Sequence, residues 1–316
     1  MNLSFEALLA VAPIYAAIAT GFAARKFGWM EAAADKSFMK VAIDITLPCF
    51  ILANMLSNKK LESVEFSAAA ILTGMAGMLA CMAVSYIASA AIGLKVGTGK
   101  RTFIVTTATH NYGFFVISML AVMYAGSSDP ILGVAFTHNV GCDLVFWTIG
   151  FFLISSGQNF SAKTFLRGPI VAVFAALVLV WCGLGDFVLK YAQNTLRVIG
   201  GCAIPLNLFM FGNLLCDFWG REKFNPKIIA TAMITRLAVL PMMFVAAAAL
   251  LPIDPTLKKL LVFQAVAPCG ITSAVLAKHF GGYPQMSVQI SVATSVAAVL
   301  TLPIWLNVGF RLIGAQ

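Results

Sequence analysis

The chain has 316 residues, of which 60% are hydrophobic and only 10% are charged. Soluble globular domains carry about 25% charged residues and must expose part of their surface to water, so this composition excludes an ordinary soluble domain. The net charge of +9 therefore does not indicate a nucleic-acid partner. We expect the lysines and arginines in short connections beside a lipid bilayer.

Hydrophobic stretches long enough to cross a bilayer core of roughly 30 Å recur along the whole chain. The first stretch contains Glu6 and is not preceded by Lys or Arg, so we interpret it as a span and not as a secretion signal. We predict an all-α, polytopic membrane protein with ten transmembrane helices, at residues 5–25, 36–56, 66–93, 101–124, 130–155, 168–186, 195–216, 226–251, 257–279 and 284–310.

The distribution of positive charge predicts the orientation of these spans. Most of the 21 lysines and arginines fall in connections that lie inside if the N-terminus is outside. Short connections rich in Lys and Arg stay on the cytoplasmic side. With ten spans, both termini are then expected outside.

Proline-bearing dipeptides repeat between the two halves of the chain. Leu47-Pro48 in the second span matches Ile204-Pro205 in the seventh, and we expect a helix kink at each proline. The separation from Pro48 to Asn111 is 63 residues, as is that from Pro205 to Pro268. Because five spans is an odd number, we predict two inverted five-helix repeats, at residues 1–156 and 157–316.

The fourth and ninth spans carry helix-breaking residues near their centres. His110, Asn111 and Gly113 lie about ten residues into the fourth span, which is roughly 15 Å deep, and Pro268 and Gly270 lie at the same depth in the ninth. An interrupted helix at that depth is tolerated only where it faces protein or a wet cavity. The alternative is an ordinary proline kink with a packing glycine in each span.

Two interrupted helices would direct free N–H groups toward the membrane centre from opposite sides. Such helix N-termini bind anions without a lysine beside them. Side chains such as Asn111 would add directional hydrogen bonds. The predicted substrate site consists of Asn54, His110, Asn111, Gly113, Pro268, Gly270, Thr272 and Ser273.

Three motifs at these positions resemble those of the auxin efflux carrier family. Ala267-Pro268-Cys269-Gly270-Ile271 resembles its ninth helix, Asn111-Tyr112-Gly113-Phe114 its fourth-helix motif, and Leu47-Pro48-Cys49-Phe50 its second. The resemblance implies ten helices, crossing broken helices 4 and 9, a homodimer, and transport of organic anions such as auxin or small dicarboxylates.

This chain departs from the family pattern in two places. It has Val116 and Ser118 where the family often has a glycine and a proline after the fourth-helix motif. The connection at about 156–167 is short, whereas the plant carriers have a long loop there. The resemblance therefore favours a prokaryotic member in the cytoplasmic membrane.

Acidic residues within the spans are candidates for ion or proton coupling. Asp44 lies four residues after Lys40 and forms either an ion pair with it or a coupling site. Asp143 has no Lys or Arg nearby in sequence, and Asn139 lies one turn before it. Burial would favour its protonated form, as a proton carrier requires.

The remaining polar residues of the spans allow both a functional and a packing role. His110 and His138 are candidates for titration near neutral pH. Arg236 in the eighth span is expected to extend to the inner surface. Further cavity candidates are Asn207, Asn213 and Gln264, with helix–helix hydrogen bonds as the alternative.

The function best supported by these patterns is a secondary carrier of small organic anions, driven by protons or by the anion gradient. A sodium-coupled symporter of the bile-acid type is the alternative, although neither broken helix contains Glu. A membrane-embedded lipid enzyme is a distant third, because the chain has no DDxxD, GxSxG or HExxH motif. The seven cysteines have no CxxC spacing, and we expect neither a metal nor a cofactor.

Overall fold

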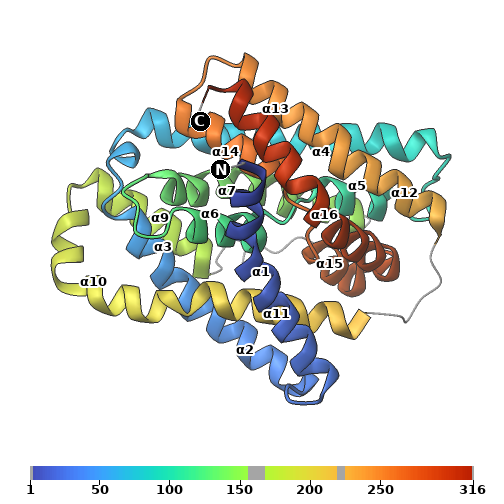
Figure 1. The fold of residues 1–316 in the computed structure, drawn as a ribbon, viewed down its shortest axis with the longest axis horizontal. Helices are drawn as coiled ribbons and strands as arrows, with labels where there is room; N and C mark the ends of the chain where they lie inside the picture. The colour runs from blue at the N-terminus through green and yellow to red at the C-terminus, as the bar shows by residue number, and fades with distance from the viewer. Residues whose placement is uncertain (1–2, 156–167, 219–224, 315–316) are drawn as a thin grey trace.

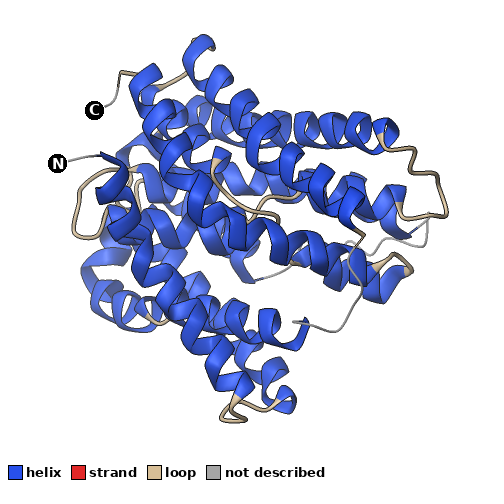
Figure 2. Cartoon of the chain, turned by 45° about the vertical axis from the view of Figure 1, so that its right-hand side comes forward, coloured by secondary structure: helices blue, strands red, loops and turns tan. Residues whose placement is uncertain are grey.

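The computed structural model describes residues 3–155, 168–218 and 225–314. Within these ranges the secondary structure is helical except for one isolated antiparallel β-bridge between His110 and Cys269. Figures 1 and 2 show the helices gathered into one bundle, and in Figure 1 α1 (Leu3–Lys26) lies across α11 (Ala203–Phe218). The all-α class predicted from the sequence is confirmed for the described residues.

The described residues 3–155 form eight α-helices. They are α1 (Leu3–Lys26), α2 (Asp35–Val41), α3 (Leu47–Met55), α4 (Val64–Ala91), α5 (Lys100–Ala108), α6 (Ile117–Met123), α7 (Ile131–Val145) and α8 (Phe151–Ser155). A π-helical turn at Ala42–Thr46 joins α2 to α3, and another at Phe146–Gly150 joins α7 to α8. A third, Tyr112–Val116, leads into α6.

The described residues 168–218 and 225–314 form eight more α-helices. They are α9 (Gly168–Trp181), α10 (Gly185–Gly201), α11 (Ala203–Phe218), α12 (Pro226–Ile234), α13 (Leu240–Leu250), α14 (Pro255–Ala265), α15 (Thr272–Phe280) and α16 (Pro284–Leu312). The π-helical turn Thr235–Val239 joins α12 to α13. The expected connection between the two halves, residues 156–167, lies outside the described residues.

Six helices in the described ranges are long and apolar enough to cross a membrane. They are Ala32–Met55, Val64–Ala91, Ile131–Ser155, Gly185–Asp217, Pro226–Leu250 and Pro284–Leu312. Three of the ten expected spans fall below this length: the fourth and the ninth, each of which is divided into two shorter helices, and the sixth, whose helix ends at Trp181. The prediction of a multi-pass membrane protein is confirmed by these six helices.

The boundary between the sixth and seventh expected spans was wrong. Helix α9 already ends at Trp181, and α10 begins at Gly185 where the sequence predicted the end of a span and then a connection. Lys190 and its polar neighbours lower the hydropathy of this segment, but the helix is amphipathic. It buries Leu189 and exposes Tyr191.

The α-helical ladder is interrupted just before each of the two prolines expected to kink a helix. The π-helical turn at 42–46 precedes Pro48. Ahead of Pro205, α10 ends at Gly201 and α11 begins at Ala203. A proline lacks the N–H of the ladder and its ring clashes with the preceding turn, which accounts for both interruptions.

Glycines allow α4 and α7 to approach at backbone contact. A Cβ atom on Gly141 would lie 1.9 Å from the carbonyl oxygen of Ile71, and one on Gly74 would lie 2.1 Å from that of His138. Helix association in a bilayer depends on such close packing, because lipid tails remove the hydrophobic drive. This contact fixes the rotation of α7 about its axis, and so the direction in which Asn139 and Asp143 point.

Arg25 joins three helices at one end of the bundle. It forms an ion pair with Asp35 at the start of α2, and its Nε lies 3.1 Å from Asp217 Oδ1 on α11. The ion pair considered for Lys40 and Asp44 is not among the ion pairs of the described residues, and Asp44 is exposed.

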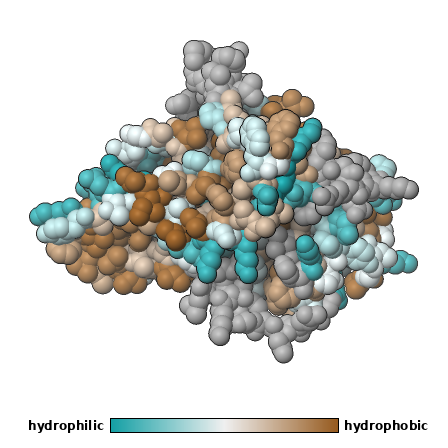
Figure 3. Space-filling model, turned by 90° about the horizontal axis from the view of Figure 1, so that it is seen from below, coloured by the Kyte–Doolittle hydropathy of each residue, from teal (hydrophilic) through white to brown (hydrophobic). Residues whose placement is uncertain are grey.

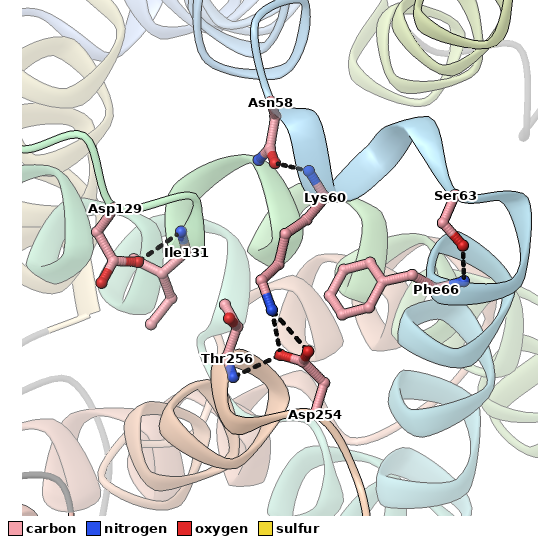
Figure 4. Close-up of polar contacts among 8 residues, drawn as sticks. All are labelled: Asn58, Lys60, Ser63, Phe66, Asp129, Ile131, Asp254 and Thr256. Carbon is pink, nitrogen blue, oxygen red and sulfur yellow. Dashed lines mark hydrogen bonds and ion pairs between the residues drawn. The ribbon is translucent and has the colours of Figure 1, made fainter.

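Two further ion pairs hold the start of α14 in place. Figure 4 shows Lys60, in the short 3-10 helix Lys59–Glu62 before α4, reaching Asp254. Its Nζ lies 2.6 Å from Asp254 Oδ2. Lys259 Nζ lies 3.2 Å from Asp129 Oδ2 in the loop before α7. Both pairs join segments that the charge distribution assigned to the same side of the membrane.

Hydrophobic side chains cover much of the outside of the bundle. In Figure 3 they gather on the left, the side on which α10 lies in Figure 1. On α9 and α10 the exposed residues include Phe174, Val178, Phe187 and Tyr191. Exposed apolar surface of this extent is suited to lipid contact.

Candidate functional site

The two interrupted helices meet at their breaks. Helix α5 ends at Ala108, α14 ends at Ala265, and the extended residues beyond them pair as the β-bridge. The Asn111 N–H donates to the Pro268 carbonyl at 2.8 Å, and the Gly270 N–H donates to the Thr109 carbonyl at 2.7 Å. Backbone groups exposed by the two breaks therefore satisfy each other.

A cavity of about 350 Å³ lies against this bridge. Most of its wall is apolar, and α3, α7, α9 and α11 contribute to it beside the two breaks, with Ile51, Phe136 and Phe211 among the lining residues. Five of the eight predicted substrate residues line it: His110, Asn111, Gly113, Gly270 and Thr272. Asp143 of the predicted coupling residues also lines it, whereas Asp44 and His138 do not.

Asn111 has a second role that the sequence argument missed. Its Oδ1 accepts hydrogen bonds from the N–H groups of Phe114 and Phe115, at 3.2 and 3.3 Å, so it caps the helical segment that restarts at Tyr112. These N–H groups are consequently not free to bind an anion, whereas the sequence pattern predicted them to be free. The Nδ2 group of the same side chain is buried and has no hydrogen-bond partner among the described residues.

The N-terminus of α15 differs from that of the fourth span. Its N-cap residue, Ile271, makes no side-chain capping hydrogen bond. The first residue of the helix, Thr272, lines the cavity. Ser273 is fully buried and donates its hydroxyl proton to the Gly270 carbonyl at 3.2 Å, so it supports the break from behind. The uncapped first turn presents its partial positive charge toward the cavity.

His110 is buried between two aromatic rings at the break. Its imidazole contacts Tyr112 and Phe244 edge-on, with ring centroids 5.2 and 5.6 Å away. Within the described residues neither of its ring nitrogens has a hydrogen-bond partner. The side chain therefore has unused hydrogen-bonding capacity beside the cavity.

Asp143 is held at the cavity wall by Tyr112. The phenol donates to Asp143 Oδ1 at 2.6 Å, and Asn139 Nδ2 donates to the Tyr112 carbonyl at 3.4 Å. Gln264 on α14 extends this network, since its Nε2 lies 3.2 Å from Asn139 Oδ1 and 3.4 Å from His138 Nδ1. The carboxylate is thus hydrogen-bonded to the fourth span, and Asn139, one turn before it on α7, connects Tyr112 of that span to Gln264 of the ninth.

The remaining predicted residues lie away from the cavity. Asn54 is half-buried and donates to the Phe50 carbonyl of its own helix at 2.7 Å. Pro268 contributes its carbonyl to the bridge and does not line the cavity. Of the other amides considered, Asn207 lines the cavity, and Asn213 is buried outside it.

Arg236 was wrongly expected to reach the membrane surface. Its side chain is completely buried, and its Nε donates to the Ala267 carbonyl at 2.9 Å. The sequence contained the signal, because Arg236 is about ten residues after the start of its helix at Pro226, which is roughly 15 Å. That distance exceeds the length of an arginine side chain.

Comparison with known proteins bears on this arrangement. A model of the family described as "Membrane transport protein" matches residues 6–164 and 157–306. The chain belongs to this family. The match confirms the resemblance to the auxin efflux carriers stated from the sequence motifs. No curated protein matches the chain.

Membership of the membrane transport protein family makes this cavity a candidate substrate site. The protein is a membrane transporter, and the cavity at the two breaks combines an unpaired amide donor, an uncapped helix start and one carboxylate. Among the described residues no three His, Cys, Asp or Glu side chains gather where they could hold a metal ion. The chemistry available at the site is hydrogen bonding, charge and apolar contact.

Proposed function

We propose that this transporter moves small organic anions, mono- or dicarboxylates, across the cytoplasmic membrane of a prokaryote. The observation that carries the proposal is the pairing of Asn111 Nδ2, a buried donor without a partner, with the uncapped start of α15 at one cavity. A carboxylate would receive charge-assisted hydrogen bonds from both. The apolar remainder of the wall would contact the body of the substrate.

Asp143 supports coupling of this transport to protons. A carboxylate substrate in the same cavity would be repelled by an ionised Asp143, by about 1 kcal/mol even at water-like screening and by more in a drier site. Binding a proton together with the anion removes the repulsion. We therefore infer that Asp143, oriented by Tyr112, accepts the coupled proton, and that transport otherwise follows the gradient of the anion itself.

We further propose that the protein has ten transmembrane segments arranged as two inverted repeats, with broken helices 4 and 9 crossing at the bridge. The packing of the helices supports this proposal. In an inverted repeat the first span corresponds to the sixth and the second to the seventh, so the contact of α1 with α11 should have a counterpart between α9 and α3, and both contacts are present. The protein is proposed to form a homodimer, with both termini outside. Labelling of Ser57→Cys from outside, and of Trp29→Cys only after permeabilisation, in a cysteine-free background tests the topology. Chemical crosslinking in membranes tests the dimer.

The substrate class is tested by uptake into proteoliposomes. A panel of radiolabelled mono- and dicarboxylates is compared with the matching neutral amides. Carboxylates should be taken up and should raise the melting temperature of the purified protein, while the amides should do neither. The Asn54→Ala variant is the matched control and should behave as wild type. Equal uptake of acids and amides would rule out an anion site.

A further inference from the structure

The buried guanidinium of Arg236 lies at the carbonyl end of the broken ninth span. Arg236 belongs to the π-helical turn that joins α12 to α13. Its Nη2 is 3.2 Å from the carbonyl oxygen of Gln264 and 3.4 Å from that of Ala265, in addition to the Nε contact with Ala267. These three oxygens come from the last turn of α14 and the break that follows it.

Carbonyl groups in that position attract positive charge. The last carbonyls of a helix have no partner within the helix and carry its partial negative charge. Where a transmembrane helix is interrupted, such carbonyls bind coupling cations in many secondary transporters. In this protein the three oxygens already have a cationic partner that is covalently part of the chain.

Among the described residues, no ion pair involves Arg236. Its electrostatic interactions include those with His110, Cys81 and Cys269, none of which carries a negative charge at neutral pH. Its Nη1 is buried without a hydrogen-bond partner in the described part of the chain. An unpaired buried charge is strongly unfavourable, so the carbonyl oxygens must supply most of its stabilisation.

We propose that Arg236 is a resident cation, which fills the carbonyl site at the end of α14 and takes the place of a dissociable alkali cation. It holds the break in shape permanently, so the wild-type crossing requires no bound cation. Removing the guanidinium leaves three converging carbonyl oxygens and space for one small monovalent cation. This inference concerns the scaffold of the crossing and does not depend on which substrate is carried.

The test is thermal unfolding of the purified full-length protein, without any organic anion, in choline, sodium, potassium or guanidinium chloride at equal, low ionic strength. The melting temperature of wild type should be the same in all four salts. Arg236→Ala should melt roughly 5 to 10 °C lower in choline. Sodium or guanidinium should restore part of that loss, with saturation at millimolar concentration. Arg236→Lys should remain insensitive to the cation, and Arg311→Ala, at an exposed arginine, is the control for lost charge.

Two results would overturn the proposal. One is a wild-type melting temperature that rises specifically with sodium, because the site would then not be filled. The other is an Arg236→Ala protein that no small cation restores. If Arg236→Ala cannot be purified, Arg236→Gln replaces it with the same expected recovery, and a lysine variant stabilised by sodium counts against the inference. Neither result is evidence about carboxylate uptake, so failure of this inference would leave the proposed function standing.

Discussion

Asn111 combines two roles that substitution can separate. Its Oδ1 caps the restarted helix through Phe114 and Phe115, while its Nδ2, which has no partner among the described residues, is the donor that we propose for a carboxylate. Asn111→Asp keeps an acceptor for the two N–H groups but replaces the donor with a second oxygen. Asn111→Ala removes both groups. Both variants should therefore bind a carboxylate more weakly than wild type, Asn111→Asp the more weakly of the two because its ionised side chain also repels the substrate, and they should differ in stability.

The expected magnitudes follow from the contacts. A hydrogen bond to a charged group is worth about 1.5–3 kcal/mol, so loss of the Nδ2 donor should weaken carboxylate binding by roughly 10- to 150-fold in Asn111→Ala. The weakening should be greater in Asn111→Asp, because its carboxylate repels the substrate. Loss of an N-cap costs about 1 kcal/mol. Asn111→Ala should consequently melt a few degrees below wild type, and Asn111→Asp should melt close to wild type, since an acidic residue suits a helix N-terminus.

Both quantities come from one experiment. Thermal unfolding without ligand reports the cap, and the dependence of the melting temperature on carboxylate concentration reports binding. Initial uptake rates in proteoliposomes provide an independent readout, with Asn54→Ala as the control. Wild-type affinity in Asn111→Asp would refute the donor role. Equal destabilisation of the two variants would refute the capping role.

Three further predictions concern coupling, packing and the ion pairs. Asp143→Asn should abolish stimulation of uptake by an imposed pH gradient, because the site can no longer accept a proton; unchanged stimulation would exclude it. Gly141→Ala should lower the melting temperature, by an amount reflecting about 1–3 kcal/mol of overpacking against α4, whereas Gly201→Ala, with open space around its Cβ position, should not. Partial burial raises the pKa of Asp254, but hydrogen bonds from Lys60 and Thr256 outweigh it and leave the pKa below its usual value. Asp254→Asn retains the cap and should be less stable than wild type by at most about 1 kcal/mol above the unfolded pKa of about 3.9. In a series of melting curves, this difference should vanish as the pH falls through the lower folded pKa.

The positions of the breaks could be predicted from the sequence because they depend on local chemistry. Pro268, Gly270 and Asn111 disfavour a continuous helix at any location, and their depth within apolar spans follows from counting residues. The depth of Arg236 could have been counted in the same way. The interpretation failed there because it assumed that an unpaired arginine must reach water and did not consider carbonyl groups as partners.

Other features depend on tertiary contacts that periodicity does not encode. The hydrogen bond from Tyr112 to Asp143 joins residues on different helices, and its existence depends on the rotation of α7 that Gly74 and Gly141 fix. The apolar cavity wall from α9 and α11 likewise requires the packing of the second part of the chain against the first. The capping role of Asn111 did have a local signal, since asparagine is favoured where a helix begins.

The paired hydrogen bonds between Thr109–Asn111 and Pro268–Gly270 have a mechanical consequence. Each bond is shielded from water, and leaving its donor and acceptor unpaired in a dry interior would cost several kcal/mol. Neither of these two segments can therefore shift relative to the other without a large cost in free energy. Any displacement that changes access to the cavity has to move both segments together, so the hinges of such a movement lie in connections outside the crossing.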